Sequence, residues 1–149
     1  MITKLGREKL QKEIKELKLE LKRTYEERSE AAAEGDLKEN SAYIFMGERA
    51  QVLSSQISEA EDDLKLSIVK EAPKQIEIIE FGHRVKVIFE QDKREINITL
   101  VGKNDARLKT DWISFESPIG LALMGKKKSD RVLVNDQFVT VLDIEVGEI

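Results

Sequence analysis

The sequence predicts an α+β protein in which an N-terminal antiparallel coiled-coil hairpin precedes a small antiparallel-sheet domain with one short helix. Three observations support this prediction. Apolar residues recur at intervals of three and four over the first half of the chain, a short polar segment interrupts them, and an alternation with a period of two begins near residue 76. The first pattern is typical of helices that pack along a seam, and the last of strands with one buried face. The expected domains are residues 1–75 for the hairpin and 76–149 for the sheet.

The first expected helix runs from Thr3 to about Ala33 and contains no proline. The spacing of its apolar residues predicts a narrow coiled-coil seam, in contrast to the broader apolar face of a helix that lies on a sheet. The expected seam consists of Leu10, Ile14, Leu17, Leu21 and Tyr25.

A second helix with its own seam is expected to follow. Gly35 can end the first helix and Asp36 can cap the second, and two amphipathic helices joined by a short turn pack antiparallel. We therefore expect Asp36 near the tip of the hairpin. Arg49 stands where the pattern calls for an apolar residue, and the other expected seam residues are Ala42, Met46, Leu53, Ile57, Ala60 and Leu64.

The second half of the chain predicts four strands and one short helix. Pro73 and its neighbours close the helical region, and β-branched residues then alternate with polar ones, which is typical of half-buried strands. A helix is expected at Pro118–Met124, and His83 and Trp112 are expected to be structural. The expected strands are 83–89, 95–101, 131–134 and 139–144.

Composition excludes several classes of protein. The chain has no cysteine and one histidine, which excludes disulfide frameworks and the usual Cys/His zinc sites. No apolar segment approaches the ~20 residues of a membrane span, so no membrane partner is expected. A net charge of −4 argues against a generic nucleic-acid binder, which must neutralise many phosphates. These features fit a cytoplasmic protein.

Asp36 and Glu39 can be interpreted in two ways. Asp36-Leu37-Lys38-Glu39 fits a capping box, in which the first side chain bonds the backbone at the start of a helix and the glutamate bonds back to the cap. Alternatively, two carboxylates three residues apart at an exposed helix start can hold a hard divalent cation weakly, with other ligands completing its shell. The residues alone leave both interpretations open.

The segment Gly35-Asp36-Leu37-Lys38-Glu39-Asn40-Ser41-Ala42-Tyr43 resembles the tip signature of the GreA/GreB family of bacterial transcript-cleavage factors. The resemblance covers nearly the whole chain in the same order. Its other parts are Thr3 to Gly6 with Leu10 and Leu17, then Phe81-Gly82, Ile113-Ser114, Ser117-Pro118-Ile119-Gly120, Ala122-Leu123 and Gly125-Lys126.

The resemblance implies a hairpin that enters the secondary channel of RNA polymerase and an FKBP-like C-terminal domain that docks at the channel rim. Asp36 and Glu39 would be both catalytic and metal-binding, sharing Mg²⁺ with the polymerase, and the free protein would not bind this ion stably. The polymerase's own site would then cleave backtracked RNA. The chain is thus expected to donate carboxylates without being an enzyme itself.

Three further tip residues, Lys38, Asn40 and Tyr43, are expected to contact the polymerase or the RNA. The implied partners are RNA polymerase and the 3′ end of the nascent RNA inside it. No small-molecule substrate is expected.

Two departures from the family pattern leave alternatives open. Family members usually carry an acidic residue at the position of Ala42 and a basic one at Gly47, and Arg49 lies on a different face of the expected helix. The first alternative is therefore a Gre-like regulator that enters the channel without stimulating cleavage. The second is a scaffolding coiled coil joined to a prolyl-isomerase-like domain, for which the 5% aromatic content offers little material for a pocket.

Overall fold

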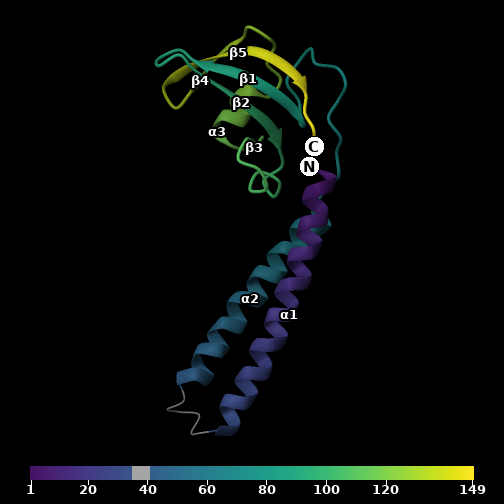
Figure 1. Ribbon diagram of the computed structural model, residues 1–149, viewed down its shortest axis with the longest axis vertical. Helices are drawn as coiled ribbons and strands as arrows, with labels where there is room; N and C mark the ends of the chain where they lie inside the picture. The colour runs from purple at the N-terminus through teal and green to yellow at the C-terminus, as the bar shows by residue number, and fades with distance from the viewer. Residues whose placement is uncertain (35–40) are drawn as a thin grey trace. The chain divides into compact units, whose positions relative to one another are not determined.

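The computed structural model describes residues 1–34 and 41–149 (Figure 1). The chain divides into two compact units. A hairpin unit covers Glu8–Leu66, and a sheet unit combines Met1–Arg7 with Ser67–Ile149. No helix in the described part of the chain has the length and apolar character needed to cross a membrane.

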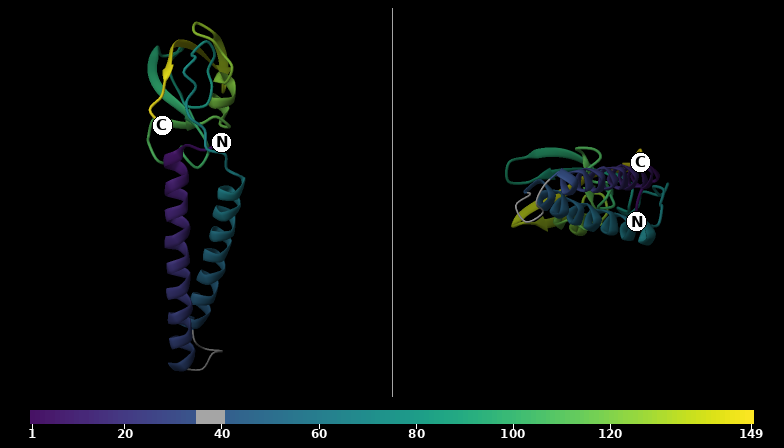
Figure 2. Two further views of the ribbon diagram at one scale, coloured as in Figure 1. Left: turned by 90° about the vertical axis from the view of Figure 1, so that its right-hand side faces the viewer. Right: turned by 90° about the horizontal axis from the view of Figure 1, so that it is seen from below.

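The hairpin unit confirms the predicted pair of antiparallel helices. Helices α1 (Lys4–Glu34) and α2 (Ser41–Leu66) lie side by side in the views of Figures 1 and 2. Lys18 Nζ of α1 lies 2.7 Å from Glu61 Oε1 of α2, whereas Arg28, further along α1, lies over the ring of Tyr43, near the start of α2. The later residue of α1 thus contacts the earlier residue of α2, which shows that the two helices are antiparallel.

The seam of α1 differs from the prediction at its C-terminal end. Tyr25 is 50% exposed, whereas Thr24 is buried and its hydroxyl donates a 2.8 Å hydrogen bond to the Glu20 carbonyl. Because the hydroxyl is satisfied within the helix, a polar residue can occupy the seam. The residues that α1 buries or partly buries along this line are Leu10, Ile14, Leu17, Leu21, Thr24 and Arg28, which keep heptad spacing.

Helix α2 shows a similar one-residue shift at its beginning. Ala42 is exposed, and Ala50 is buried in place of the neighbouring Arg49, which forms an ion pair with Glu20 of α1. Further along α2, the predicted seam residues Leu53, Ile57 and Ala60 are buried as expected. The buried residues of α2 are Ala50, Leu53, Ile57 and Ala60.

The sheet unit has five strands in the order β3-β2-β1-β5-β4, with antiparallel pairing everywhere except between β2 and β3. The four predicted strands and the short helix are confirmed, with small shifts at their ends. Strand β3 was not predicted, because three residues are too few to show a period. The elements are β1 (His83–Phe89), β2 (Arg94–Val101), β3 (Trp112–Ser114), α3 (Pro118–Leu123), β4 (Arg131–Val134) and β5 (Gln137–Val146).

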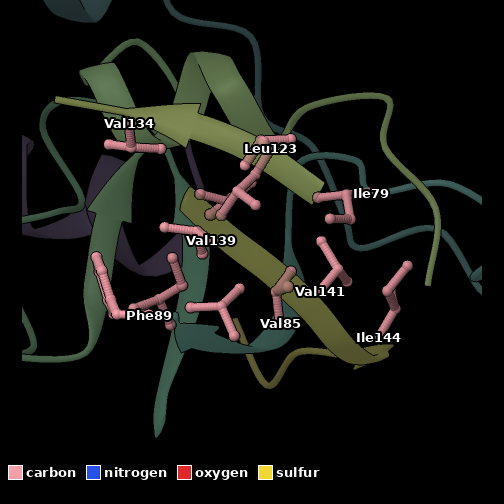
Figure 3. Packing of buried hydrophobic residues seen from close by; sticks show 12 residues of the cluster. Ile79, Val85, Phe89, Leu123, Val134, Val139, Val141 and Ile144 are labelled. Carbon is pink, nitrogen blue, oxygen red and sulfur yellow. The ribbon is translucent and has the colours of Figure 1, made fainter. Parts of the chain in front are cut away.

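The main core of the sheet unit lies between the sheet and α3. Burial alternates along β1 in the pattern expected of a strand with one buried face. Figure 3 shows side chains of β1, β4 and β5 converging with Leu123 of α3 and Ile79, and these residues belong to one buried cluster. A second cluster joins Phe81, Val101 and Trp112, with Leu5 packed against it. Trp112 therefore has the structural role predicted for it.

His83 is also structural. The ring is fully buried, its Nδ1 accepts a 3.1 Å hydrogen bond from the Glu80 backbone N–H, and its Nε2 lies 2.9 Å from the Pro73 carbonyl oxygen. A carbonyl oxygen can only accept, so Nε2 carries the proton and the ring is the neutral tautomer. Both ring nitrogens are used to fix the segment before β1.

The first residues of the chain belong to the sheet unit and not to the hairpin. Ile2 forms a parallel bridge with Val69, and the buried Asp105 carboxylate binds Thr3 through its backbone N–H, at 3.0 Å, and its hydroxyl, at 2.7 Å. We call these contacts between Thr3 and Asp105 the N-terminal clasp. The compact units therefore depend on contacts between distant parts of the chain, which no local pattern announces, and the predicted division between residues 75 and 76 stays a prediction.

Candidate functional site at the end of the hairpin

Four of the five predicted tip residues lie outside the described residues. They are Asp36, Lys38, Glu39 and Asn40, so their proposed roles stay predictions. Within residues 1–34 and 41–149, no three histidine, aspartate or glutamate side chains are grouped so that they could hold a metal ion. Tyr43, the fifth predicted residue, lies in the first turn of α2 and defines the site that can be described.

The ring of Tyr43 contacts the guanidinium of Arg28, which comes from the opposite helix. Arg28 Cζ lies 4.3 Å from the centroid of the Tyr43 ring, which is a close cation–π geometry. Arg28 comes seven residues after Leu21, so the heptad pattern places it on the seam, where it faces α2. Its Nε is buried and has no hydrogen-bond partner within the described ranges. Toward the tip end, the seam therefore contains an arginine–tyrosine cation–π pair, in which the Arg28 Nε donor has no partner among the described residues.

Gly47 makes room for this pair. A Cβ atom added at Gly47 would lie 3.2 Å from Nη2 of Arg28 and 3.3 Å from its Cζ and Nε. Such distances are tighter than ordinary van der Waals contact, so a side chain at this position would press on the guanidinium. The position where the family pattern has a basic residue is thus occupied, in this chain, by a guanidinium that arrives from α1.

A groove of about 680 Å³ opens beside the pair. Its lining combines aromatic rings, hydroxyls and an amide with one basic and one acidic residue. The lining residues are Tyr25, Arg28, Tyr43, Ile44, Gly47, Glu48, Ala50, Gln51, Ser54 and Ser55. The groove can therefore take a ligand that offers both a planar group and an anion.

Arg49 does not contribute to the groove. Its guanidinium forms an ion pair with Glu20, and both side chains are about half exposed, so solvent weakens this pair. Because Arg49 is directed to Glu20, it does not replace the basic residue missing at Gly47.

Reasoning from the sequence singled out Tyr43 but missed Arg28. The signal was present in the heptad spacing from Leu21, but a charged residue does not register in a search for apolar positions. Gly47 was a second indication, because a glycine inside a helix often marks a place where another part of the protein comes close to the backbone.

Comparison with known proteins agrees with this organisation. A family model described as "Transcription elongation factor, N-terminal" matches residues 1–69, and one described as "Transcription elongation factor, GreA/GreB, C-term" matches residues 73–146. Transcription elongation factor GreA of Rickettsia bellii (strain OSU 85-389) is 36% identical over 135 residues, which cover 89% of this chain and 84% of that protein.

Two further relatives lie at greater distance. Transcription elongation factor GreA of a Nitratiruptor species is 31% identical over 134 residues, covering 89% of this chain and 82% of that protein. The crystal structure of GreA factor homolog 1 of Thermus thermophilus aligns over 97% of both chains at 22% identity with a TM-score of 0.45, a likeness too weak to support an argument. The family models and the curated relatives are sufficient: this chain belongs to the GreA/GreB family of transcription elongation factors.

Proposed function

We propose that the protein binds RNA polymerase and stimulates cleavage of backtracked nascent RNA, with Asp36 and Glu39 as the residues that assist the reaction. The observation that carries the proposal is the complete segment from Gly35 to Tyr43, which follows α1 in the sequence and includes the first three residues of α2, in a chain of the GreA/GreB family. The protein would act in the bacterial cytoplasm, where transcription takes place.

The donor chemistry of this segment fits Mg²⁺. Carboxylate oxygens are the ligands that this ion prefers, and Asp36 and Glu39 supply two of them. Because Mg²⁺ keeps most of its water unless more ligands are offered, we expect the two residues to hold it only together with groups of the polymerase. When bound there, the ion would stabilise charge on the attacking and leaving oxygens of the phosphodiester.

The polymerase would supply the catalytic site, and this chain would bring carboxylates to it. The continuous seam supports this division of labour, because two helices that pack along heptad positions form a stiff support for the segment that joins them. We expect the sheet unit to provide docking to the polymerase.

A second candidate function is regulation of the polymerase through the same channel without stimulated cleavage. Ala42 favours it, since this exposed position carries no carboxylate that could assist a metal ion. Gly47 also favours it, because it removes a basic side chain near the tip segment.

The test is RNA cleavage in a stalled, backtracked elongation complex, with polymerase binding measured separately. We expect Asp36→Asn and Glu39→Gln to reduce stimulated cleavage at least ~100-fold, because each change keeps the shape of the side chain and removes the charge. Polymerase binding should change little. Glu59→Gln is the matched control, since Glu59 is an exposed carboxylate on the same hairpin and should be dispensable.

Two outcomes would contradict the proposal. Wild-type cleavage by either tip variant would show that the carboxylates do not assist the reaction. Binding of the wild-type protein without any stimulation of cleavage would support the regulatory alternative.

A further inference from the structure

One row of side chains crosses the face of the sheet opposite to α3. Strand pairing aligns Glu145 of β5 with Arg84 of β1, and Arg84 with Thr99 of β2. It also aligns Thr99 with Trp112 of β3. Paired residues on neighbouring strands point to the same face, and the next residue of β1, Val85, belongs to the core shared with α3. The row therefore lies on the face that the main core leaves free.

A pocket of about 340 Å³ is lined by all four members of this row. Its volume is near the lower end of the range for ligand pockets, which is enough for a small molecule or a single side chain. Every lining residue belongs to the sheet unit. They are Arg84, Thr99, Lys109, Asp111, Trp112, Glu145, Val146 and Glu148.

The most buried residue of the pocket has an unused hydroxyl. Thr99 is 2% exposed, and its methyl carbon Cγ2 is directed toward Gly147, where an added Cβ atom would lie 3.0 Å away. The hydroxyl forms no hydrogen bond with any residue in 1–34 or 41–149, and it is not sealed from the pocket. Buried polar groups are nearly always hydrogen-bonded, so a ligand that donates a hydrogen bond can satisfy this oxygen.

The pocket already binds two cations of the chain itself. Arg84 lies between two carboxylates, with Nη1 2.9 Å from Asp111 Oδ2 and Nε 3.5 Å from Glu145 Oε1. Lys109 Nζ lies 4.7 Å from the centroid of the Trp112 ring, a cation–π contact. These internal contacts show that both the carboxylates and the indole ring of the pocket accept positive groups.

One carboxylate of the pocket has no partner. Glu148 is exposed and forms no ion pair with a residue in the described part of the chain. Three acidic side chains accompany two basic ones in the lining, so the unbalanced charge is negative and favours a cationic ligand. A guanidinium matches this lining better than an ammonium group, because it is planar, stacks on aromatic rings and can form two parallel hydrogen bonds with a carboxylate.

We propose that this pocket binds a guanidinium group, supplied by an arginine side chain of a protein or by a small molecule of the same chemistry. Glu148 pairs with the guanidinium, the Thr99 hydroxyl accepts one of its hydrogen bonds, and the Trp112 ring lies against its face. The ligand replaces Lys109 on that ring. The inference goes beyond the proposed function and does not depend on it, because no residue of the hairpin unit takes part.

The experiment follows the indole N–H of Trp112, the only tryptophan, by NMR in the isotope-labelled full chain. The ligands are N-acetylarginine methylamide, which represents a protein side chain, and agmatine, a free guanidinium compound. N-acetylcitrulline methylamide is the uncharged control of the same shape. We expect a saturable shift with a guanidinium ligand and none with citrulline. Tighter binding of agmatine would identify a small molecule as the ligand, tighter binding of the capped arginine would identify a protein side chain, and either result supports the site.

Two substitutions should change the affinity in opposite directions. Glu148→Gln should weaken binding about threefold, as expected for loss of one exposed charge pair. Lys109→Met should strengthen it about threefold, because the ring no longer carries a cation of its own. Glu116→Gln and Lys126→Met are the matched controls, since both residues are exposed charges of the sheet unit outside the pocket, and they should leave the dissociation constant unchanged.

Three results would overturn the inference. The first is the absence of a saturable Trp112 shift with both guanidinium ligands. The second is equal binding of the citrulline compound, which would show that the positive charge is not recognised. The third is an equal gain in Lys109→Met and Lys126→Met, which would reduce the effect to the overall charge of the protein. RNA cleavage tests the proposed function separately, because none of these titrations contains polymerase.

Discussion

The N-terminal clasp provides a direct test of how the sheet unit is stabilised. The Thr3 hydroxyl donates to Asp105 Oδ1 at 2.7 Å and accepts a 2.9 Å hydrogen bond from the Gly6 backbone N–H. It therefore satisfies a buried carboxylate and caps the first turn of α1 at once. Thr3→Val keeps the shape of the side chain and removes both hydrogen bonds.

The expected loss of stability follows from these two contacts. A hydrogen bond to a charged group contributes about 1.5–3 kcal/mol, and loss of a helix cap costs about 0.5–2 kcal/mol. Valine cannot replace either contact, and Thr3 is fully buried, so water does not compensate. We expect Thr3→Val to lower the free energy of unfolding of the sheet unit by about 2–5 kcal/mol.

The assay is urea unfolding followed by the fluorescence of Trp112, the only tryptophan, which is buried in the sheet unit. Thr3→Ser is the control, because serine keeps both hydrogen bonds and loses one buried methyl group, worth about 0.8 kcal/mol. If Thr3→Val were no less stable than Thr3→Ser, the hydroxyl would not hold the N-terminal residues in place and the reasoning would fail.

Two further predictions concern contacts at the surface. Gly47→Ala should stabilise the hairpin by up to ~1 kcal/mol through helix propensity, because the Arg28 guanidinium needs to move by only a few tenths of an ångström to admit the methyl group and can stay over the Tyr43 ring. Thermal unfolding followed by circular dichroism measures this change, and a lower midpoint would contradict the prediction. In the sheet unit, a hydrogen bond from Arg131 lowers the pKa of Glu90, so Arg131→Met should raise that pKa toward its ordinary value in a carboxyl NMR titration. Because the pKa is lowered in the folded state, the pair stabilises the fold above the ordinary pKa of Glu90, and this contribution disappears as pH falls through the lowered value. A Glu90 titration unchanged by Arg131→Met would refute the assignment.

The sequence predicts most of the secondary structure because the signals are local. Strand β1 was predicted at its observed limits, since every second side chain is buried along it. Strand β3 escaped prediction because its three residues pair with β2 in parallel, and only the folded sheet shows that pairing. Length and periodicity decide which elements can be recognised in advance.

The seam and the site show a different limit. Thr24 and Arg28 occupy heptad positions but are polar, so a search for apolar residues moved to Tyr25 and lost the register. The N-terminal clasp could not be predicted from the sequence for another reason: Thr3 and Asp105 are 102 positions apart, and no local pattern connects them. The tip segment was recognised from its resemblance to a family, and the chemistry of Asp36 and Glu39 depends on a partner that no pattern within one chain describes.

The continuity of α1 bears on the order in which the protein assembles during synthesis. Lys4 to Arg7 belong to the sheet unit, while the same helix continues into the hairpin from Glu8. At ~5–20 residues per second, the ribosome needs several seconds to proceed from Leu66 to Asp105. The hairpin helices are thus complete while the start of α1 still lacks its partners, so the nascent sheet must assemble on a helix that already exists. Ile2 meets its backbone partners Ile68 and Lys70 early in this interval, whereas Thr3 stays without Asp105 until its end, so the Thr3 end of α1 remains open to chaperones and proteases for longest.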